Sequence, residues 1–275
     1  MPAVQNLKKQ LRGIRSTQKL TKAMKTVSTV KFSKLNGVYN DFSLYGRECA
    51  NIYSKYDSSF VKVLSAADEN APTLAVVMAA NKGMCGSFNS ELLNFAVKEL
   101  SDIGEYRLVT VGKKATAFFE KKNIPIEKEY AFDDIPSYEE ASLLLDDIAL
   151  LRSQGKISKV KIIYPHYVNM MHQAPSVCEL FSAEGGDRED ETLLFVPDRE
   201  TVISRTAMTV FGSVIYELVL ETALGAQAAT LMTMRSAFDT ATEYCERLEG
   251  EINRLRQSAV TADVIETSAE ADYNA

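Results

Sequence analysis

Proline is absent from residues 201–266, and only three glycines fall within that stretch. Because these two residue types most often end helices, their scarcity predicts one continuous helix. Apolar residues recur along it in steps of three and four, which is the heptad spacing of a helix wound against a partner helix. The predicted seam contains Leu231, Met234, Phe238, Ala241, Cys245, Leu248, Ile252, Leu255, Ala259 and Ala262. At 1.5 Å per residue this helix would be roughly 100 Å long, so it requires a second long helix as its partner.

Other absences exclude several classes of protein. No uncharged apolar run reaches about 18 residues, which predicts that no helix crosses a membrane. The N-terminus is basic and amphipathic but lacks the apolar core of a signal peptide, so it is interpreted as mature protein. The four cysteines are widely spaced and form no CxxC pair, as expected for reduced thiols in a cytosolic compartment. The two histidines, His166 and His172, favour solvated or structural roles over metal binding.

A second long helix is predicted near the N-terminus, because no proline falls between Pro2 and Pro72. Residues 5–56 carry an approximate 3.5-residue apolar stripe, which polar residues such as Gln18 interrupt. Nine basic side chains precede Asp41, the first acidic residue of the chain. They are Lys8, Lys9, Arg12, Arg15, Lys19, Lys22, Lys25, Lys31 and Lys34. An uncompensated basic helix in a chain of net charge −6 indicates an anionic partner.

Three interpretations of this basic helix remain open. Nucleic acid is disfavoured, because no aromatic residues interleave with the cations and no nucleic-acid-binding motif is present. A solvated helix face and contact with an acidic protein surface both fit the charge pattern.

The centre of the chain has a different pattern. Six of the seven prolines lie between residues 72 and 197, where predicted strands alternate with predicted helices. Strands are expected at residues 73–80, 107–111, 160–164, 176–181 and 193–196, and helices at 91–100, 113–122 and 138–152. This order predicts an α/β fold: a Rossmann-like domain on a mostly parallel sheet, inserted between the two long helices. The predicted domains are residues 1–58, 72–197 and 200–266, followed by a polar, frayed tail at 267–275.

The turn after the first predicted strand resembles a nucleotide site only superficially. Gly83 and Gly86 form a GxxG pattern, which matches neither the dinucleotide fingerprint nor the Walker pattern. A glycine turn that leads into a helix is common in α/β folds for geometric reasons alone. No histidine is placed to activate Cys85 as a nucleophile. The acidic segment at 184–191 is expected to be an exposed loop. The sequence therefore predicts no catalytic residue, no cofactor, no metal and no nucleotide binding.

Four segments resemble those of one family in the same order along the chain. KLTKAMKTVSTVKFSKL at residues 19–35 resembles the N-terminal signature of the gamma subunit of F-type ATP synthases. MAANKGMCGSFN at 78–89 and LFVPD at 194–198 are similar to the family's central turn and to the turn before its last helix. NRLRQSAVTADVIE at 253–266 is similar to its C-terminal signature.

The resemblance implies a rotor shaft. The terminal helices would form an antiparallel coiled coil inside a ring of alpha and beta subunits, and the α/β domain would contact the epsilon subunit and the c-ring. Torque would pass between the ion-driven c-ring and the catalytic head, at the cytoplasmic face of a bacterial membrane. The residues expected to contact other subunits are Lys9, Arg12, Lys22, Met24, Lys25, Lys31, Lys34, Arg256, Gln257 and Thr261. The heptad points Arg256 and Gln257 away from the seam.

The chain departs from the family pattern at several positions. Asn81 and Lys82 stand where the family usually has Asp-Arg, and Ala226 and Thr230 stand where Glu and Arg are common. The polar tail at 267–275 replaces the family's apolar, small-residue ending. Two other interpretations fit the sequence less well than a rotor. A non-catalytic coiled-coil adaptor predicts no particular signature near Arg256, and an α/β enzyme with helical arms lacks a catalytic constellation.

Overall fold

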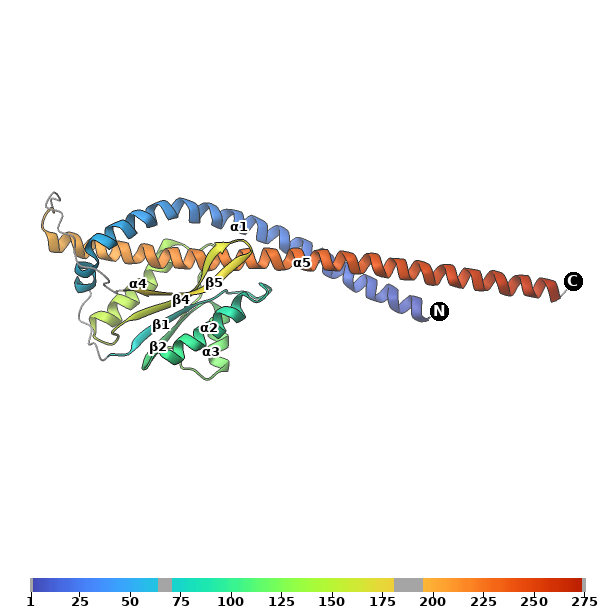
Figure 1. The fold of residues 1–275 in the computed structure, drawn as a ribbon, viewed down its shortest axis with the longest axis horizontal. Coiled ribbons are helices and arrows are strands. Elements are labelled where there is room, and N and C mark those ends of the chain that lie inside the picture. The colour runs from blue at the N-terminus through green and yellow to red at the C-terminus, as the bar shows by residue number, and fades with distance from the viewer. Residues whose placement is uncertain (1, 64–70, 181–194, 274–275) are drawn as a thin grey trace. The chain divides into compact units, whose positions relative to one another are not determined.

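The computed structural model describes residues 2–63, 71–180 and 195–273 (Figure 1). The chain forms two compact units, one made of Met1–Val27 with Leu231–Ala275 and the other of Ser28–Thr230. The two longest helices, α1 and α5, contribute to both units.

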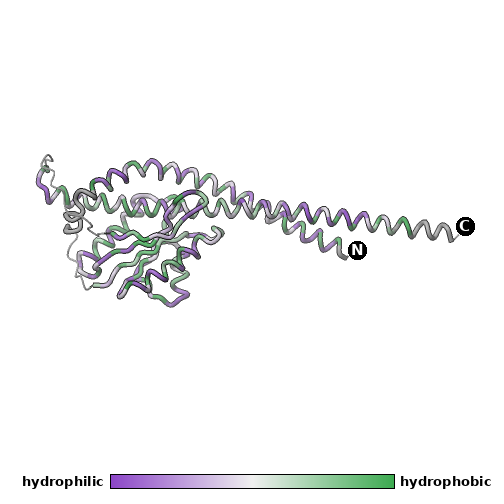
Figure 2. Tube along the Cα trace, viewed as in Figure 1, coloured by the Kyte–Doolittle hydropathy of each residue, from purple (hydrophilic) through white to green (hydrophobic). Residues whose placement is uncertain are grey.

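Helix α1 spans Pro2–Val63 and helix α5 spans Arg199–Tyr273. The only proline of α1 is its first residue, where the missing N–H costs no intrahelical bond. Both helices are longer than the sequence predicts. Residues 267–273, expected to be a frayed tail, continue α5, because they contain no glycine or proline to end the helix. Figure 2 shows hydrophilic and hydrophobic residues alternating along both helices.

The unit that contains both chain ends is an antiparallel helix pair. Gln18 lies beside Thr242 and Arg15 beside Glu249, so residue numbers fall along α5 as they rise along α1. Its buried cluster contains Leu11 of α1 with Cys245 and Leu248 of α5, and Leu7, Ile14 and Ile252 pack around them. This is the packing expected of two helices that share an apolar seam.

The other unit contains a five-stranded sheet in the order β3-β2-β1-β4-β5. Its strands are β1 (Thr73–Met78), β2 (Tyr106–Val111), β3 (Lys128–Tyr130), β4 (Val160–Asn169) and β5 (His172–Leu180). The first four run parallel, and β5 pairs antiparallel with β4, which agrees with the mostly parallel sheet expected from sequence.

Three details of the strand prediction are corrected. The edge strand β3 was missed, because Lys128 and Glu129 are charged and exposed and the strand has only three residues. Strands β4 and β5 form a longer hairpin than predicted, and Pro165 pairs with Pro175 within it. Phe195 and Val196 do not form the last predicted strand. The remainder of that strand, residue 181 and the acidic segment at 184–191 lie outside the described residues.

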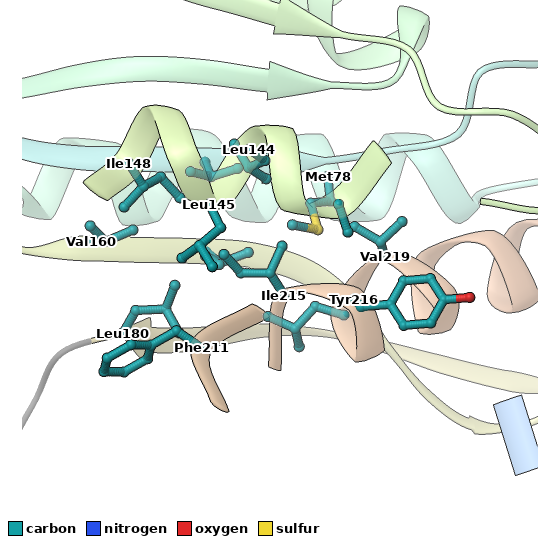
Figure 3. Close-up of a cluster of buried hydrophobic side chains, with 14 of the residues drawn as sticks. Met78, Leu144, Leu145, Ile148, Val160, Leu180, Phe211, Ile215, Tyr216 and Val219 are labelled. Carbon is teal, nitrogen blue, oxygen red and sulfur yellow. The ribbon is translucent and has the colours of Figure 1, made fainter. Parts of the chain in front are cut away.

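Side chains alternate between the two faces of the sheet and separate its core into two layers. From β1, Ala75 and Val77 pack beneath α2 (Phe88–Asp102) and α3 (Lys113–Lys121). Leu74, Val76 and Met78 point to the opposite face and pack against α4 (Tyr138–Ser153) and α5. Figure 3 shows side chains from α4 and α5 meeting over this second face.

The loop before α4 is fixed by reciprocal hydrogen bonds. Ser137 accepts from the backbone N–H of Glu140 at 3.2 Å, and Glu140 accepts from that of Ser137 at 2.8 Å, a capping box. Glu140 also accepts from the backbone N–H of Asp133 at 3.0 Å. The bond to Asp133 fixes the backbone next to Asp134.

By length and composition, α5 contains a segment that could cross a membrane, a possibility that the sequence analysis excluded. However, 72% of its most apolar window is buried within the protein. Val210, Phe211 and Ile215 of α5 lie in the main core, so this segment is the central helix of a packed domain.

Candidate functional site

The candidate interaction surface of α1 is its basic face. Lys9, Arg12, Lys22 and Lys34 are exposed, as a contact role requires. The Arg12 guanidinium also donates to the carbonyl of Lys8 at 3.4 Å. These side chains present mobile positive charge, which is suited to meeting carboxylates on another protein.

Two members of the predicted contact set, Met24 and Lys25, are only partly exposed. The ammonium of Lys25 lies 5.7 Å from the centre of the Phe238 ring, within the range of a cation–π contact. This contact joins α1 to α5, so Lys25 also contributes to the helix pair.

Lys31 has a partner within the chain. Its ammonium binds the carboxylate of Asp134, and Lys82 binds the same carboxylate oxygen at 2.7 Å. Partial burial by itself raises the pKa of Asp134, but the hydrogen bonds from the two lysines outweigh burial and hold the pKa below its ordinary value. The structure therefore assigns Lys31 to an internal network, which the charge pattern alone did not reveal.

The C-terminal contact residues lie on the outside of α5. Arg256 and Gln257 are exposed, and Thr261 is exposed while its hydroxyl donates to the carbonyl of Gln257 at 2.9 Å. An exposed guanidinium beside an exposed amide can bind carboxylate and backbone groups of a neighbour.

The predicted seam residues differ in burial. Met234 and Leu248 are 5% and 6% exposed, while Leu231, Phe238 and Ile252 are partly exposed. Leu255 is 36% exposed. Since Arg15 lies beside Glu249, Leu255 lies opposite the N-terminal turns of α1, close to the end of the helix pair.

Three further apolar side chains near the end of α5 were not singled out from sequence. Val260, Val264 and Ile265 are 54%, 61% and 62% exposed. They present apolar surface close to Arg256 and Gln257.

Asn81, the first residue of the glycine turn after β1, is bonded to two other segments of the chain. The side chain of Asn81 donates to the carbonyl of Phe132 and accepts from the backbone N–H of Lys113 at 3.2 Å. The second bond occupies the N-terminus of α3, where phosphates bind in many α/β proteins. Gly112, with φ of 95°, approaches so closely that a Cβ there would lie 2.0 Å from the carbonyl oxygen of Ala79.

Hydrogen bonding explains why Asn81 stands where the family usually has Asp. An amide both donates and accepts, whereas an ionised carboxylate only accepts. Asp at this position could therefore not form the bond to Phe132 that Asn81 forms.

Cys85 is buried beneath the same turn. The amide of Asn89 donates to its sulfur at 3.0 Å. Burial raises the pKa of the Cys85 thiol, with smaller opposing effects from Asn89 and Lys114, so little nucleophilic thiolate forms near neutral pH.

A pocket of about 60 Å³ lies between the ends of β1 and β2 and helix α5. Three alanines line it, Ala79, Ala80 and Ala223. Ala226 and Thr230 also line it, and at these two positions small residues replace the family's charged pair. The Thr230 hydroxyl donates to the carbonyl of Ala226 at 2.8 Å. Among the described residues, no three His, Cys, Asp or Glu side chains come together as a metal site.

Comparisons with known proteins agree with this architecture. A family profile described as ATP synthase matches residues 3–271. The ATP synthase gamma chain of Rubrobacter xylanophilus is 28% identical over 285 residues, covering 99% of this chain and 98% of the relative. That of Pelotomaculum thermopropionicum is 28% identical over 275 residues, covering 97% of each chain.

Solved structures share the fold. A chain from the rotor of the Euglena gracilis mitochondrial ATP synthase matches with a TM-score of 0.65 and 17% identity, covering 94% of this chain and 99% of that one. A chain from the OSCP/F1/c-ring structure of the same enzyme matches with a TM-score of 0.68 and 17% identity, covering 96% and 92%.

Proposed function

Since this chain belongs to the gamma-chain family of ATP synthases, we propose that it is the central rotor of such an enzyme and that its helix pair transmits torque. The membrane c-ring would turn the α/β domain, and the helix pair would turn within the catalytic head of alpha and beta subunits. The observation that carries this proposal is the antiparallel pairing of α1 with α5, whose buried seam includes Leu11 and Leu248.

The helix pair has the interactions that a torque-bearing element requires. Shear between α1 and α5 would break the bond of Gln18 to Thr242, at 2.8 Å, and the ion pair of Arg15 with Glu249, at 2.6 Å. Packed apolar side chains resist sliding as well, because interiors are dense and do not deform continuously. Rigidity of the pair is therefore the functional property.

Contacts with the head would come from two surfaces. Lys9, Arg12, Lys22 and Lys34 would meet carboxylates of the beta subunits, with Met24 and Lys25 beside them. Arg256, Gln257 and Thr261 would bind a loop of one beta subunit in one rotary state. The epsilon subunit and the c-ring would contact the α/β domain.

The chain itself would perform no catalysis. This part of the proposal is supported by two observations: the Asn81 side chain already accepts from the backbone N–H of Lys113 at the start of α3, and burial raises the pKa of the Cys85 thiol. The assembled complex would lie at the cytoplasmic face of a bacterial membrane, with this subunit held there by its partners.

The test is rotation in an assembled head. A probe attached through Ser101→Cys, at an exposed position of α2, should turn in one direction when ATP is added. The isolated chain should show no ATP hydrolysis, which serves as the control. A head that hydrolyses ATP while the probe stays fixed would contradict the rotor. If the chain were instead a coiled-coil adaptor, the probe would be expected to stay fixed while ATP is hydrolysed.

A further inference from the structure

Glu221 of α5 is the one buried carboxylate among the described side chains, with 5% of its surface exposed. It accepts hydrogen bonds from the Tyr39 hydroxyl at 2.9 Å and from the backbone N–H of Tyr167 at 3.3 Å. The Nδ1 atom of His166 lies 2.9 Å from the same carboxylate. Glu221 therefore joins α1, β4 and α5 through a single charged group.

A second carboxylate lies one helical turn away. Glu217 is partly buried, and residues four apart on a helix face the same side. Its carboxylate is close to α1, since a Cβ added at Gly46 would lie 3.1 Å from Oε2 of Glu217. Burial, and next the charge of Glu221, raise the pKa of Glu217, while Arg47 and His166 act in the opposite direction.

The groups that surround this pair come from three other elements. Helix α1 supplies Tyr39 and Arg47, strand β4 supplies Tyr164 and His166, and strand β5 supplies Cys178.

Burial is the main reason that the three uncharged groups around the pair stay protonated. It raises the pKa of both tyrosines, and Glu221 adds to the effect. Burial, with smaller effects from nearby carboxylates, raises the pKa of Cys178 to about 11. These three groups are neutral near neutral pH, so the charge balance of the site depends on Arg47, His166 and the two carboxyl groups.

We propose that Glu217 and Glu221 form a proton-sensitive latch that holds α1 against α5 and β4. When Glu217 is protonated, the pair carries one negative charge, which Tyr39 and His166 can satisfy. When Glu217 loses its proton, a second negative charge lies one helical turn from Glu221 and close to the backbone of α1. The attraction of Arg47 offsets burial and the charge of Glu221 only in part, so α1 is held less firmly from Tyr39 to Gly46. The latch lies within the unit Ser28–Thr230 and does not depend on the proposed rotor function.

The direction of the pH dependence follows from the raised pKa of Glu217. Below the ordinary pKa of 4.5, Glu217 is protonated in both the folded and the unfolded chain, and the latch is closed. As pH rises, the unfolded chain ionises first, so folded stability falls until Glu217 also ionises in the folded state. The latch is therefore weakened as pH rises from 4.5 through the raised pKa of Glu217.

The experiment compares the full-length chain with Glu217→Gln across roughly pH 5 to 9, about two units to either side of neutral. The amide keeps the shape of protonated Glu217 but cannot ionise. Hydrogen-exchange protection of residues 39–47 should be similar in both chains at low pH, and the wild type should lose protection as pH rises. A difference of roughly tenfold corresponds to each unit by which the pKa is raised. Glu120→Gln, at an exposed position of α3, should behave like the wild type.

Two further results decide the proposal. Tyr39→Phe removes one bond to Glu221 and should lower protection at every pH while leaving the pH dependence in place. If Glu217→Gln does not fold, protection of residues 39–47 must still fall as pH rises in both the wild type and Tyr39→Phe, and protection that stays constant in both would overturn the latch. A ratio of protection between wild type and Glu217→Gln that is constant with pH would overturn the latch.

Discussion

Gln18 donates a 2.8 Å hydrogen bond to Thr242 at the point where the apolar stripe of α1 is interrupted. The Thr242 hydroxyl in turn donates to the carbonyl of Phe238 at 2.9 Å. A polar pair within an apolar seam can fix the register of two helices, because only one alignment satisfies both groups.

Gln18→Ala should therefore lower stability by about 1 kcal/mol, the net contribution of an ordinary hydrogen bond. Urea unfolding followed by circular dichroism would measure the change. Gln10→Ala, at an exposed position of the same helix, should change stability by less than about 0.5 kcal/mol. Equal effects of the two substitutions would show that the bond to Thr242 contributes nothing.

Leu248 and Leu255 offer a matched comparison within the seam. Leu248 is 6% exposed and Leu255 is 36% exposed. Leu248→Ala should cost ~2–5 kcal/mol, as for other buried leucines, because it leaves a cavity beside Leu11 and Cys245. Leu255→Ala should cost less than half as much. Thermal unfolding of the two variants measures the difference, and a larger effect at Leu255 would contradict the observed burial.

Asp134→Asn should remove the charge that binds Lys31 and Lys82. Because the ion pairs are partly exposed, the expected loss at neutral pH is about 1 kcal/mol. The pKa of Asp134 is lowered in the folded chain, so its contribution is present above pH 3.8 and is lost as pH falls through the folded pKa. Stability of the wild type and the variant should converge in acid. Asp102→Asn, at an exposed site, is the control, and a gap that does not narrow in acid would refute the effect.

The basic face of α1 can be tested apart from Lys31. A fourfold variant should assemble less well with the alpha and beta subunits, and the loss should be greatest at low salt. In this variant Glu replaces Lys9, Arg12, Lys22 and Lys34. Each exposed pair contributes only ~0–1 kcal/mol, so single substitutions should have little effect. Analytical ultracentrifugation at two salt concentrations would measure assembly. Normal assembly of the fourfold variant would indicate a merely solvated face.

Arg256→Ala combined with Gln257→Ala should leave the helix pair folded, because both side chains are exposed. ATP hydrolysis by the assembled head should fall tenfold or more, since a charge-assisted hydrogen bond contributes roughly 1.5–3 kcal/mol. Steady-state hydrolysis, with incorporation of the variant verified, is the measurement. Arg254→Ala, exposed on the same helix, is a suitable control, and unchanged turnover in the double variant would make both residues ordinary surface.

Much of the fold could be predicted from the sequence because its main signals are local. Proline-free stretches and heptads identified α1 and α5, and the apolar run at residues 73–80 identified β1. Strand β3 was missed because its charged residues carry no apolar pattern.

The internal networks could not be predicted at all. Lys31 and Asp134 are 103 residues apart in sequence, and Tyr39 and Glu221 are 182 apart. Charge patterns place Lys31 on a basic face, but only the fold shows which carboxylate reaches it.

The two edges of the sheet have a consequence for the life of the subunit before it meets its partners. Edge strands invite pairing with a second copy, and such pairing leads to aggregation. Here β3 has only three residues, of which Lys128 and Glu129 are charged and exposed, and β5 carries Pro175, which has no N–H to donate. Both edges are poor templates for intermolecular strands. Pairing of one free copy with another through the edges of this sheet is therefore disfavoured.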